Sequence, residues 1–150
     1  MSETVLVVGV GAVAGIGAAV ARKFAGAGYH VVVSGRTREK LEIVVLQIQE
    51  TGGSADYIVG DVTSDADQKR LAAIVQDRDE PLAAVIYNAG SNLPIKFEDL
   101  TPAQFEEFWR IGCFGAFLTA HHLLPILSQQ GRGSMLFTGA SASLRGRPNF

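Results

Sequence analysis

The sequence predicts a three-layer α/β/α domain around a doubly wound parallel sheet with strand order 3-2-1-4-5. Three observations support this prediction. Short runs rich in Val, Ile and Leu do not alternate with polar residues, as in strands that are buried on both faces. Stretches with helical spacing follow these runs, and strands that alternate with helices form parallel sheets covered on both faces. Glycines at positions 9, 11, 15 and 17 join the first run to its helix, which indicates a tight turn that a ligand can approach.

The composition is that of one packed domain covering residues 1–150. The chain is 47% hydrophobic and 19% charged, which argues against disorder. Its 13 basic and 15 acidic residues give a net charge of −2 with no basic stripe, so nucleic acid is not an expected partner. Cys113 is the only cysteine, which excludes an internal disulfide and a cysteine-rich metal site, and no metal is expected. Because no export signal is recognised, the chain is expected to be cytoplasmic.

The first strand, the glycine turn and the helix start lie within Val5–Gly17 (VLVVGVGAVAGIG), and the helix continues through Ala18–Ala27. A helix N-terminus leaves N–H groups unpaired and carries partial positive charge, so it attracts a phosphate. We therefore predict that a dinucleotide pyrophosphate lies over Gly11–Gly17. The glycines follow a GxxxGxG pattern rather than the commoner GxGxxG, because Ala occupies position 14.

Three alternatives to a phosphate site are open at this point. The uncharged stretch Thr4–Ala21 is long enough for a membrane span, and Gly11 and Gly15 would form a GxxxG face on it. A signal peptide is disfavoured because Glu3, and no basic residue, precedes the apolar run. The glycines could also form a turn without a ligand. The strand-to-helix order of the later segments favours the phosphate site, because such units are not expected after a membrane helix.

The second unit repeats this order. Its helix is expected to begin at the capping residue Thr37 and to end at Gly52-Gly53. The spacing places four apolar residues on one face of this helix, Leu41, Val44, Val45 and Ile48. The second to fifth strands are expected at His30–Ser34, Ala55–Val59, Leu82–Tyr87 and Ser134–Thr138.

Two further helices are expected. Ser64 and Asp67 resemble a capping box at the start of the third helix. The buried face of that helix is expected to hold Leu71, Ile74 and Val75. A longer helix starts at Thr101-Pro102 and extends to about Gln129, with a kink or an early end at Pro125.

Ligands of such sheets bind beyond the carboxyl ends of the strands, where further polar residues stand. Arg36 follows the second strand, where an NAD site usually has Asp or Glu, and its guanidinium fits a 2′-phosphate; the alternative is a solvated surface arginine. Asp61 could accept a hydrogen bond from an adenine amino group or serve as a loop carboxylate. Asn88–Gly90 could line the nicotinamide side or form a plain turn. Arg38 and Lys40 are interpreted as helix surface.

On these residues the sequence resembles the short-chain dehydrogenase/reductase family. Val10–Gly17 (VGAVAGIG) is similar to the family's TGxxxGIG, Asp61-Val62 to its adenine contact, and Tyr87–Gly90 (YNAG) to its NNAG. Phe137–Pro148 (FTGASASLRGRP) resembles the family's fifth strand and following loop. The resemblance implies a Rossmann-type sheet, an NAD(P) cofactor, reversible hydride transfer between a carbonyl and an alcohol, and oligomerisation through the helix at about 101–129.

The chain departs from the family pattern at the catalytic positions. The family's catalytic Asn falls at Gly112 and its catalytic Ser at Ala140. Ser141, next to the latter, is the only candidate within the chain for contact with the reacting carbonyl. Tyr87 replaces the first Asn of NNAG. The family's YxxxK pair would begin just after Phe150, so we expect the chain to be the N-terminal part of a longer family domain.

The leading hypothesis is therefore an NADP(H)-preferring oxidoreductase that acts on a small carbonyl or alcohol substrate, is a homo-oligomer and has no nucleic-acid or membrane partner. The expected cofactor-binding residues are Gly11, Ala14, Gly15, Ile16, Gly17, Arg36, Asp61, Val62, Asn88, Ala89 and Gly90. The alternative is a non-catalytic dinucleotide-binding protein, such as a redox sensor or a partner subunit, and Gly112 and Ala140 favour it.

Overall fold

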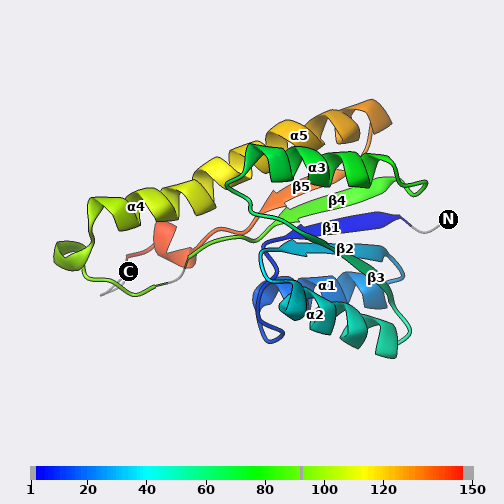
Figure 1. Cartoon of the computed structure of the whole chain (residues 1–150), viewed down its shortest axis with the longest axis horizontal. Coiled ribbons are helices and arrows are strands. Elements are labelled where there is room, and N and C mark those ends of the chain that lie inside the picture. The colour runs from blue at the N-terminus through cyan, green and yellow to red at the C-terminus, as the bar shows by residue number, and fades with distance from the viewer. Residues whose placement is uncertain (1–2, 92, 147–150) are drawn as a thin grey trace.

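The computed structural model describes residues 3–91 and 93–146 and contains a five-stranded parallel sheet (Figure 1). The strands are β1 (Thr4–Val8), β2 (His30–Gly35), β3 (Ser54–Val59), β4 (Leu82–Tyr87) and β5 (Ser134–Phe137). Their spatial order is β3-β2-β1-β4-β5, and every neighbouring pair is parallel. The predicted order and all five predicted strands are confirmed, with differences of one residue at strand ends.

Helices cover both faces of the sheet, which gives the three predicted layers (Figure 1). The helices are α1 (Ile16–Gly26), α2 (Arg38–Glu50), α3 (Asp65–Gln76), α4 (Pro102–Trp109) and α5 (Gly115–Gln130). Short 3₁₀ turns add Phe97–Asp99 and Ser141–Ser143. One face of the sheet packs against α1 and α2, and the other packs against α3 and α5.

The central strand β1 is buried along its whole length and supplies both halves of the core. Val5 and Val7 pack with α1 and α2, whereas Leu6 and Val8 pack with α3 and α5. Successive side chains of a strand point to opposite faces, so a strand between two helical layers must be apolar at every position. The segment considered as a membrane span, Thr4–Ala21, is therefore divided among β1, the glycine turn and the first part of α1.

The predicted buried face of α2 is confirmed in full, since Leu41, Val44, Val45 and Ile48 are all buried. The prediction for α3 is wrong at one position. Leu71 and Val75 are buried, but Ile74 is 39% exposed. The buried face of α3 instead includes Gln68, whose side-chain oxygen accepts a hydrogen bond of 2.8 Å from Thr119 of α5. A buried amide with a partner thus occupies a place where the apolar pattern predicts no polar residue.

The predicted helix caps have mixed outcomes. Ser64 accepts a 3.2 Å hydrogen bond from the backbone N–H of Asp67, as expected. Thr37 stands at the N-cap of α2, but its side chain makes no capping hydrogen bond with any described residue. Thr101 and Gln104 form a complete capping box at the start of α4, with Pro102 in the first turn.

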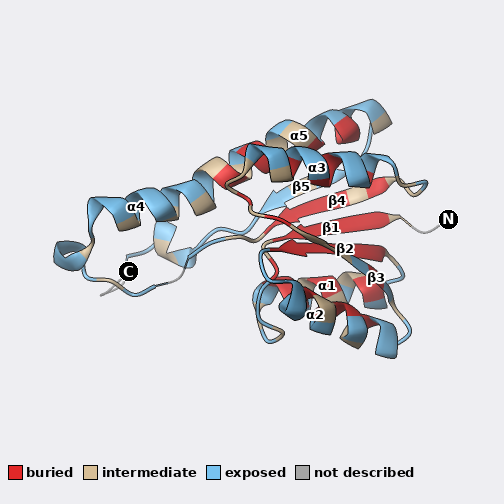
Figure 2. Cartoon of the chain, viewed as in Figure 1, coloured by how far each residue is buried: buried red, intermediate tan, exposed pale blue. Residues whose placement is uncertain are grey.

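The long helical stretch from Pro102 to Gln130 changes its hydrogen-bonding pattern in the middle. A π-helical segment, Arg110–Phe114, joins α4 to α5. Pro125 lies inside α5, so the prediction of an early end there is wrong. The stretch is long and apolar enough to cross a membrane by length and composition: the mean hydropathy is 1.4, and 28% of its 18-residue apolar window is buried. In this structure α5 packs on α3 and β4, whereas α4 extends beyond the sheet and is largely exposed (Figure 2).

Several apolar side chains beyond the sheet are exposed. On α4 and α5, Phe105 is 62% exposed, Trp109 47% and Phe117 59%. The apolar sequence around Cys113 predicts a buried side chain, but Cys113 is exposed, so this prediction is wrong. The edge strand β5 is also open, with Phe137 52% exposed.

Candidate functional site

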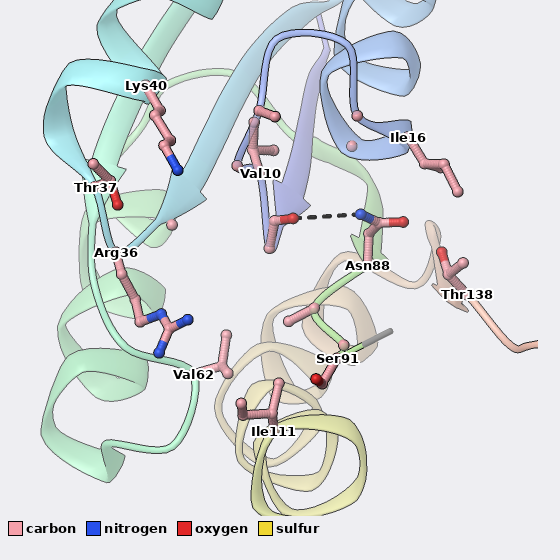
Figure 3. A pocket seen from close by; sticks show the side chains of 18 of the residues that line it. Val10, Ile16, Arg36, Thr37, Lys40, Val62, Asn88, Ser91, Ile111 and Thr138 are labelled. Carbon is pink, nitrogen blue, oxygen red and sulfur yellow. Dashed lines mark hydrogen bonds between the residues drawn. The ribbon is translucent and has the colours of Figure 1, made fainter. Parts of the chain in front are cut away.

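A cleft of about 980 Å³ lies at the carboxyl ends of the strands (Figure 3). The turn after β1, the start of α1, the segments that follow the other four strands, and the π-helical segment all contribute to its walls. The lining residues are 9–12, 15–17, 35–37, 40, 60–62, 88–91, 111 and 138–142. This is the position at which open α/β sheets bind ligands.

Glycines allow the loops at this edge to approach one another closely. Gly9 has a φ of +89°, and a Cβ there would collide with the backbone of Ala89 after β4. A Cβ at Gly35, at the end of β2, would collide with the carbonyl oxygen of Val10. Gly11 differs, because a Cβ there would meet no described atom within 4 Å. The first two glycines are needed for the fold itself, whereas Gly11 leaves space in the cleft wall.

The N-terminus of α1 borders the cleft through Gly15, Ile16 and Gly17. Gly15 is the N-cap residue, no side chain of the described residues caps the helix, and its first turn has no acidic residue. The first N–H groups and the positive end of the helix dipole are therefore free for an anion. Ala14 is exposed and does not line the cleft, so the structure separates it from the other predicted residues of the turn.

Two cations stand at one side of the cleft (Figure 3). Arg36 follows β2, and Lys40 lies in the first turn of α2, beside Thr37. Neither Arg36 nor Lys40 forms an ion pair within the part of the chain that the structure describes. The interpretation of Lys40 as mere helix surface is wrong, because it lines the cleft. Arg38 does belong to the surface, where its guanidinium donates to the Tyr57 hydroxyl at 2.7 Å.

Asp61 is held in a fixed turn at the end of β3. Its Oδ1 accepts hydrogen bonds of 2.8 Å from both the backbone N–H and the hydroxyl of Thr63. Its own backbone N–H donates to Asp67 Oδ2 at 2.9 Å. Among the described residues, nothing donates a hydrogen bond to Asp61 Oδ2. Asp61 thus has a loop role, and its second oxygen is left for another donor; Val62 beside it is buried and also lines the cleft.

The segment after β4 ties the sheet to the glycine turn. The Asn88 side-chain N–H donates to the carbonyl oxygen of Gly9 at 3.3 Å, and its backbone N–H donates to Val8 at 2.8 Å (Figure 3). Ala89 and Gly90 follow in the cleft wall, and Thr138 at the end of β5 lies on the same side as Asn88 (Figure 3). Asn88 therefore fixes the floor of the cleft by linking two strand ends.

The predicted catalytic positions do not bring a complete set of acid–base groups together. Ala140 and Ser141 both line the cleft, and Ser141 begins the 3₁₀ turn after β5. Gly112 does not line it, although its neighbour Ile111 does. Arg145, at the end of the described residues, is exposed, and Arg147–Phe150 lies outside them. Ser141 is therefore the only residue predicted for carbonyl contact that the structure places at the cleft.

The lining residues that sequence reasoning did not predict include Thr37, Lys40, Ser91, Ile111 and Thr138. Lys40 follows Arg36 by four residues, a spacing that could have indicated a shared side. Ser91 directly follows the predicted site residue Gly90, and Thr138 is the last residue of the predicted fifth strand. Ile111 carries no such signal, because it comes from the middle of a helical stretch far from any strand end.

A sequence model of the family described as short chain dehydrogenase matches residues 3–150. The chain is 31% identical over 138 residues to an oxidoreductase of Sarocladium schorii, covering 92% of this chain and 54% of that protein. It is 28% identical over 152 residues to a sepiapterin reductase of Chlorobaculum tepidum, covering 97% of this chain and 62% of that protein. The chain therefore spans about half the length of the curated relatives it matches.

Solved structures share the fold. An actinorhodin polyketide ketoreductase with NADPH matches with a TM-score of 0.90 and 26% identity, over 99% of this chain and 57% of that one. A 3-oxoacyl (acyl-carrier-protein) reductase of Agrobacterium tumefaciens with NADP bound matches with a TM-score of 0.85 and 26% identity, over 97% of this chain and 55% of that one.

Proposed function

This chain belongs to the short-chain dehydrogenase family, and from this premise we propose that it forms the dinucleotide-binding part of an oxidoreductase that prefers NADP(H). The proposed reaction transfers hydride between the nicotinamide and a small carbonyl or alcohol. Residues 1–150 would then be one dinucleotide-binding unit and the N-terminal part of a longer family domain. The single observation that carries this proposal is that one cleft holds a helix N-terminus and two cations, Arg36 and Lys40, for which no described side chain provides a cap or an ion pair.

The residues of the cleft fit a dinucleotide in both shape and charge. The open space at Gly11 and the free N–H groups at the start of α1 suit a pyrophosphate, since backbone donors and the helix dipole favour negative charge. The proposed neighbours of the pyrophosphate are Gly15, Ile16 and Gly17. Asp61 Oδ2 would accept from the adenine amino group, with Val62 beside the ring. Ala14 would act only through the turn it belongs to.

The preference for NADP(H) follows from the cations at the end of β2. A 2′-phosphate beside Arg36 and Lys40 would gain charge-assisted hydrogen bonds that a plain ribose hydroxyl does not make. The residues directly after β2 are Arg36 and Thr37, so the Asp or Glu that usually holds the ribose hydroxyls of NAD does not stand at this position. Two relatives in the solved structures have NADPH or NADP bound, which supports this choice.

On the other side of the cleft, Asn88, Ala89 and Gly90 would line the ribose and nicotinamide, with Ser141 near the reacting carbonyl. When bound, the cofactor supplies or accepts the hydride. The chain's own part is to hold the two reactants together, and orientation of this kind accounts for much of a rate enhancement. Exposed aromatic residues on α4 and α5 support the further proposal that copies of the chain associate through this helix.

The first test is a titration with NADPH and NADH, followed by nicotinamide fluorescence. We expect tighter binding of NADPH, and we expect Arg36→Ala to weaken NADPH binding roughly ten- to a hundredfold while leaving NADH binding unchanged. Arg38→Ala is the matched control, because Arg38 is a surface cation two residues away that does not line the cleft. Equal affinity for both dinucleotides, or equal losses in both variants, would contradict the proposed preference.

A second candidate is a non-catalytic dinucleotide-binding protein. Gly112 and Ala140 favour it, because neither can supply the side chain found at those positions in the family. Incubation of the NADPH complex with a panel of aldehydes and ketones separates the two. Consumption of NADPH supports the oxidoreductase, whereas tight binding without turnover of any compound supports the sensor or partner subunit.

A further inference from the structure

One buried hydroxyl connects the end of β4 to the π-helical segment. Tyr87 is the last residue of β4, and only 2% of it is exposed. Its hydroxyl donates a hydrogen bond to the backbone carbonyl oxygen of Ile111. Burial, with a smaller contribution from Asp61, raises the pKa of Tyr87 well above the usual range of tyrosine, so the hydroxyl remains protonated and able to donate at neutral pH.

The Tyr87 hydroxyl lies close to the backbone at the start of α5. A Cβ at Gly115, the first residue of α5, would lie 2.5 Å from the Tyr87 hydroxyl oxygen and 3.0 Å from Val62 Cγ2. Any larger residue at position 115 would therefore push the hydroxyl away from Ile111. The missing side chain at Gly115 lets the helix pass close enough for the hydrogen bond to form.

The bond is made where the helix departs from regular geometry. Residues 110–114 form the π-helical segment between α4 and α5, and π-helical turns inside helices often occur at functional sites. Ile111 lies in this segment and also lines the cleft (Figure 3). Val62, on the loop after β3, lines the cleft as well. Asn88, which links β4 to the glycine turn, directly follows Tyr87. The Tyr87 hydroxyl thus links two parts of the cleft wall, the end of β4 and the π-helical segment.

We propose that Tyr87 is a positioning residue, whose hydroxyl holds the π-helical segment against β4 and keeps Ile111 in the wall of the dinucleotide cleft. Without this hydrogen bond, the Ile111 carbonyl oxygen is free to return to a regular α-helical partner. That change would rotate the residues of the segment and withdraw Ile111 from the cleft. The effect on binding rests on the proposed function, whereas the effect on the segment does not.

Tyr87→Phe removes the hydroxyl alone, and Trp109 reports on the segment without any ligand. Trp109 is the only tryptophan of the chain, directly precedes the segment and stacks on Phe114 within it at 5.8 Å between ring centroids. We expect a shifted Trp109 emission in the folded Tyr87→Phe variant. Tyr57→Phe is the matched control, because its hydroxyl also donates to a protein oxygen, Glu42 Oε1 at 2.7 Å, but lies away from the cleft.

Gly115→Ala is a second variant that disturbs the same bond from the other side and leaves Tyr87 in place. We expect it to shift Trp109 emission in the same direction. Adding Tyr87→Phe to Gly115→Ala should raise the melting temperature relative to Gly115→Ala alone, because the clash with the hydroxyl is removed. Unchanged Trp109 emission in both single variants, measured below their melting temperatures, overturns the proposal.

Dinucleotide binding provides the second measurement. We expect Tyr87→Phe to weaken NADPH binding roughly two- to tenfold, the equivalent of one hydrogen bond, and Tyr57→Phe to leave it unchanged. If the unaltered chain binds NADPH but Tyr87→Phe binds it equally well, the positioning role is refuted and the proposed function stands. If the unaltered chain binds neither dinucleotide, the proposed function fails, and Trp109 emission alone decides whether Tyr87 positions the segment.

Discussion

Replacing Gly11 with valine should block dinucleotide binding and leave the fold intact. The glycines of the turn after β1 have different structural roles. Gly9 has a positive φ and lies against the backbone of Ala89, so the fold requires it. Gly11 lines the cleft at an ordinary φ, and a Cβ there meets no described atom within 4 Å. Only the space available to a ligand should change when a side chain is added at Gly11.

The structure predicts different effects on stability for valine at position 11 and valine at position 9. Gly11→Val should leave the free energy of unfolding unchanged or raise it by about 0.4–1 kcal/mol, because the unfolded chain loses freedom and the folded chain has room. Its Kd for NADPH should rise at least about tenfold, or about 1.4 kcal/mol, since the methyl groups occupy the path of the pyrophosphate. Gly9→Val should lose roughly 2–6 kcal/mol of stability from backbone strain and the collision with Ala89.

The assay combines thermal unfolding followed by circular dichroism with NADPH titration of the same samples. Gly26→Val is the matched control, because Gly26 in the last turn of α1 also has open space around its Cβ but does not line the cleft. A stable Gly11→Val variant that binds NADPH like the unaltered chain would refute the placement of the pyrophosphate over this turn. A strongly destabilised one would refute the argument from open space.

Two other outcomes follow from buried groups outside the cleft. Burial, and the nearby Arg78 guanidinium, lower the pKa of His30 below its ordinary 6.5, so the unfolded chain takes up this proton first as the pH falls. The contribution of His30 to stability is therefore complete above pH 6.5 and is lost below it. Urea unfolding at several pH values should show this fall in the free energy of unfolding, and an equal fall in the His30→Gln variant would contradict the prediction. Leu71→Ala should cost about 2–5 kcal/mol and Ile74→Ala less than about 1 kcal/mol, because only the first side chain is buried; equal losses in urea unfolding would show that exposure does not separate them.

Most of the frame of the site could be predicted from the chain itself. The residues after strands β1 to β4 that were predicted to meet, from Gly11 to Gly90, do meet at one edge of the sheet, apart from Ala14. Parallel strands end at the same edge, so a residue directly after a strand is located by the strand alone. The exceptions came from helices. Lys40 lines the cleft because the first turn of α2 lies beside it. Ile74 is exposed because the buried face of α3 consists of Gln68, Leu71, Ala72 and Val75.

The sequence by itself determined the layers, the strand order and the glycine turn, because each is encoded in local periodicity and in single residues without a side chain. Only the tertiary structure decided which of these glycines the fold requires and which leaves room for a ligand. It also decided that Tyr87 and Ile111, 24 positions apart, share a hydrogen bond. Such contacts depend on where a long helix changes its geometry and how closely it approaches the sheet, and these are set by packing among distant segments rather than by any local pattern.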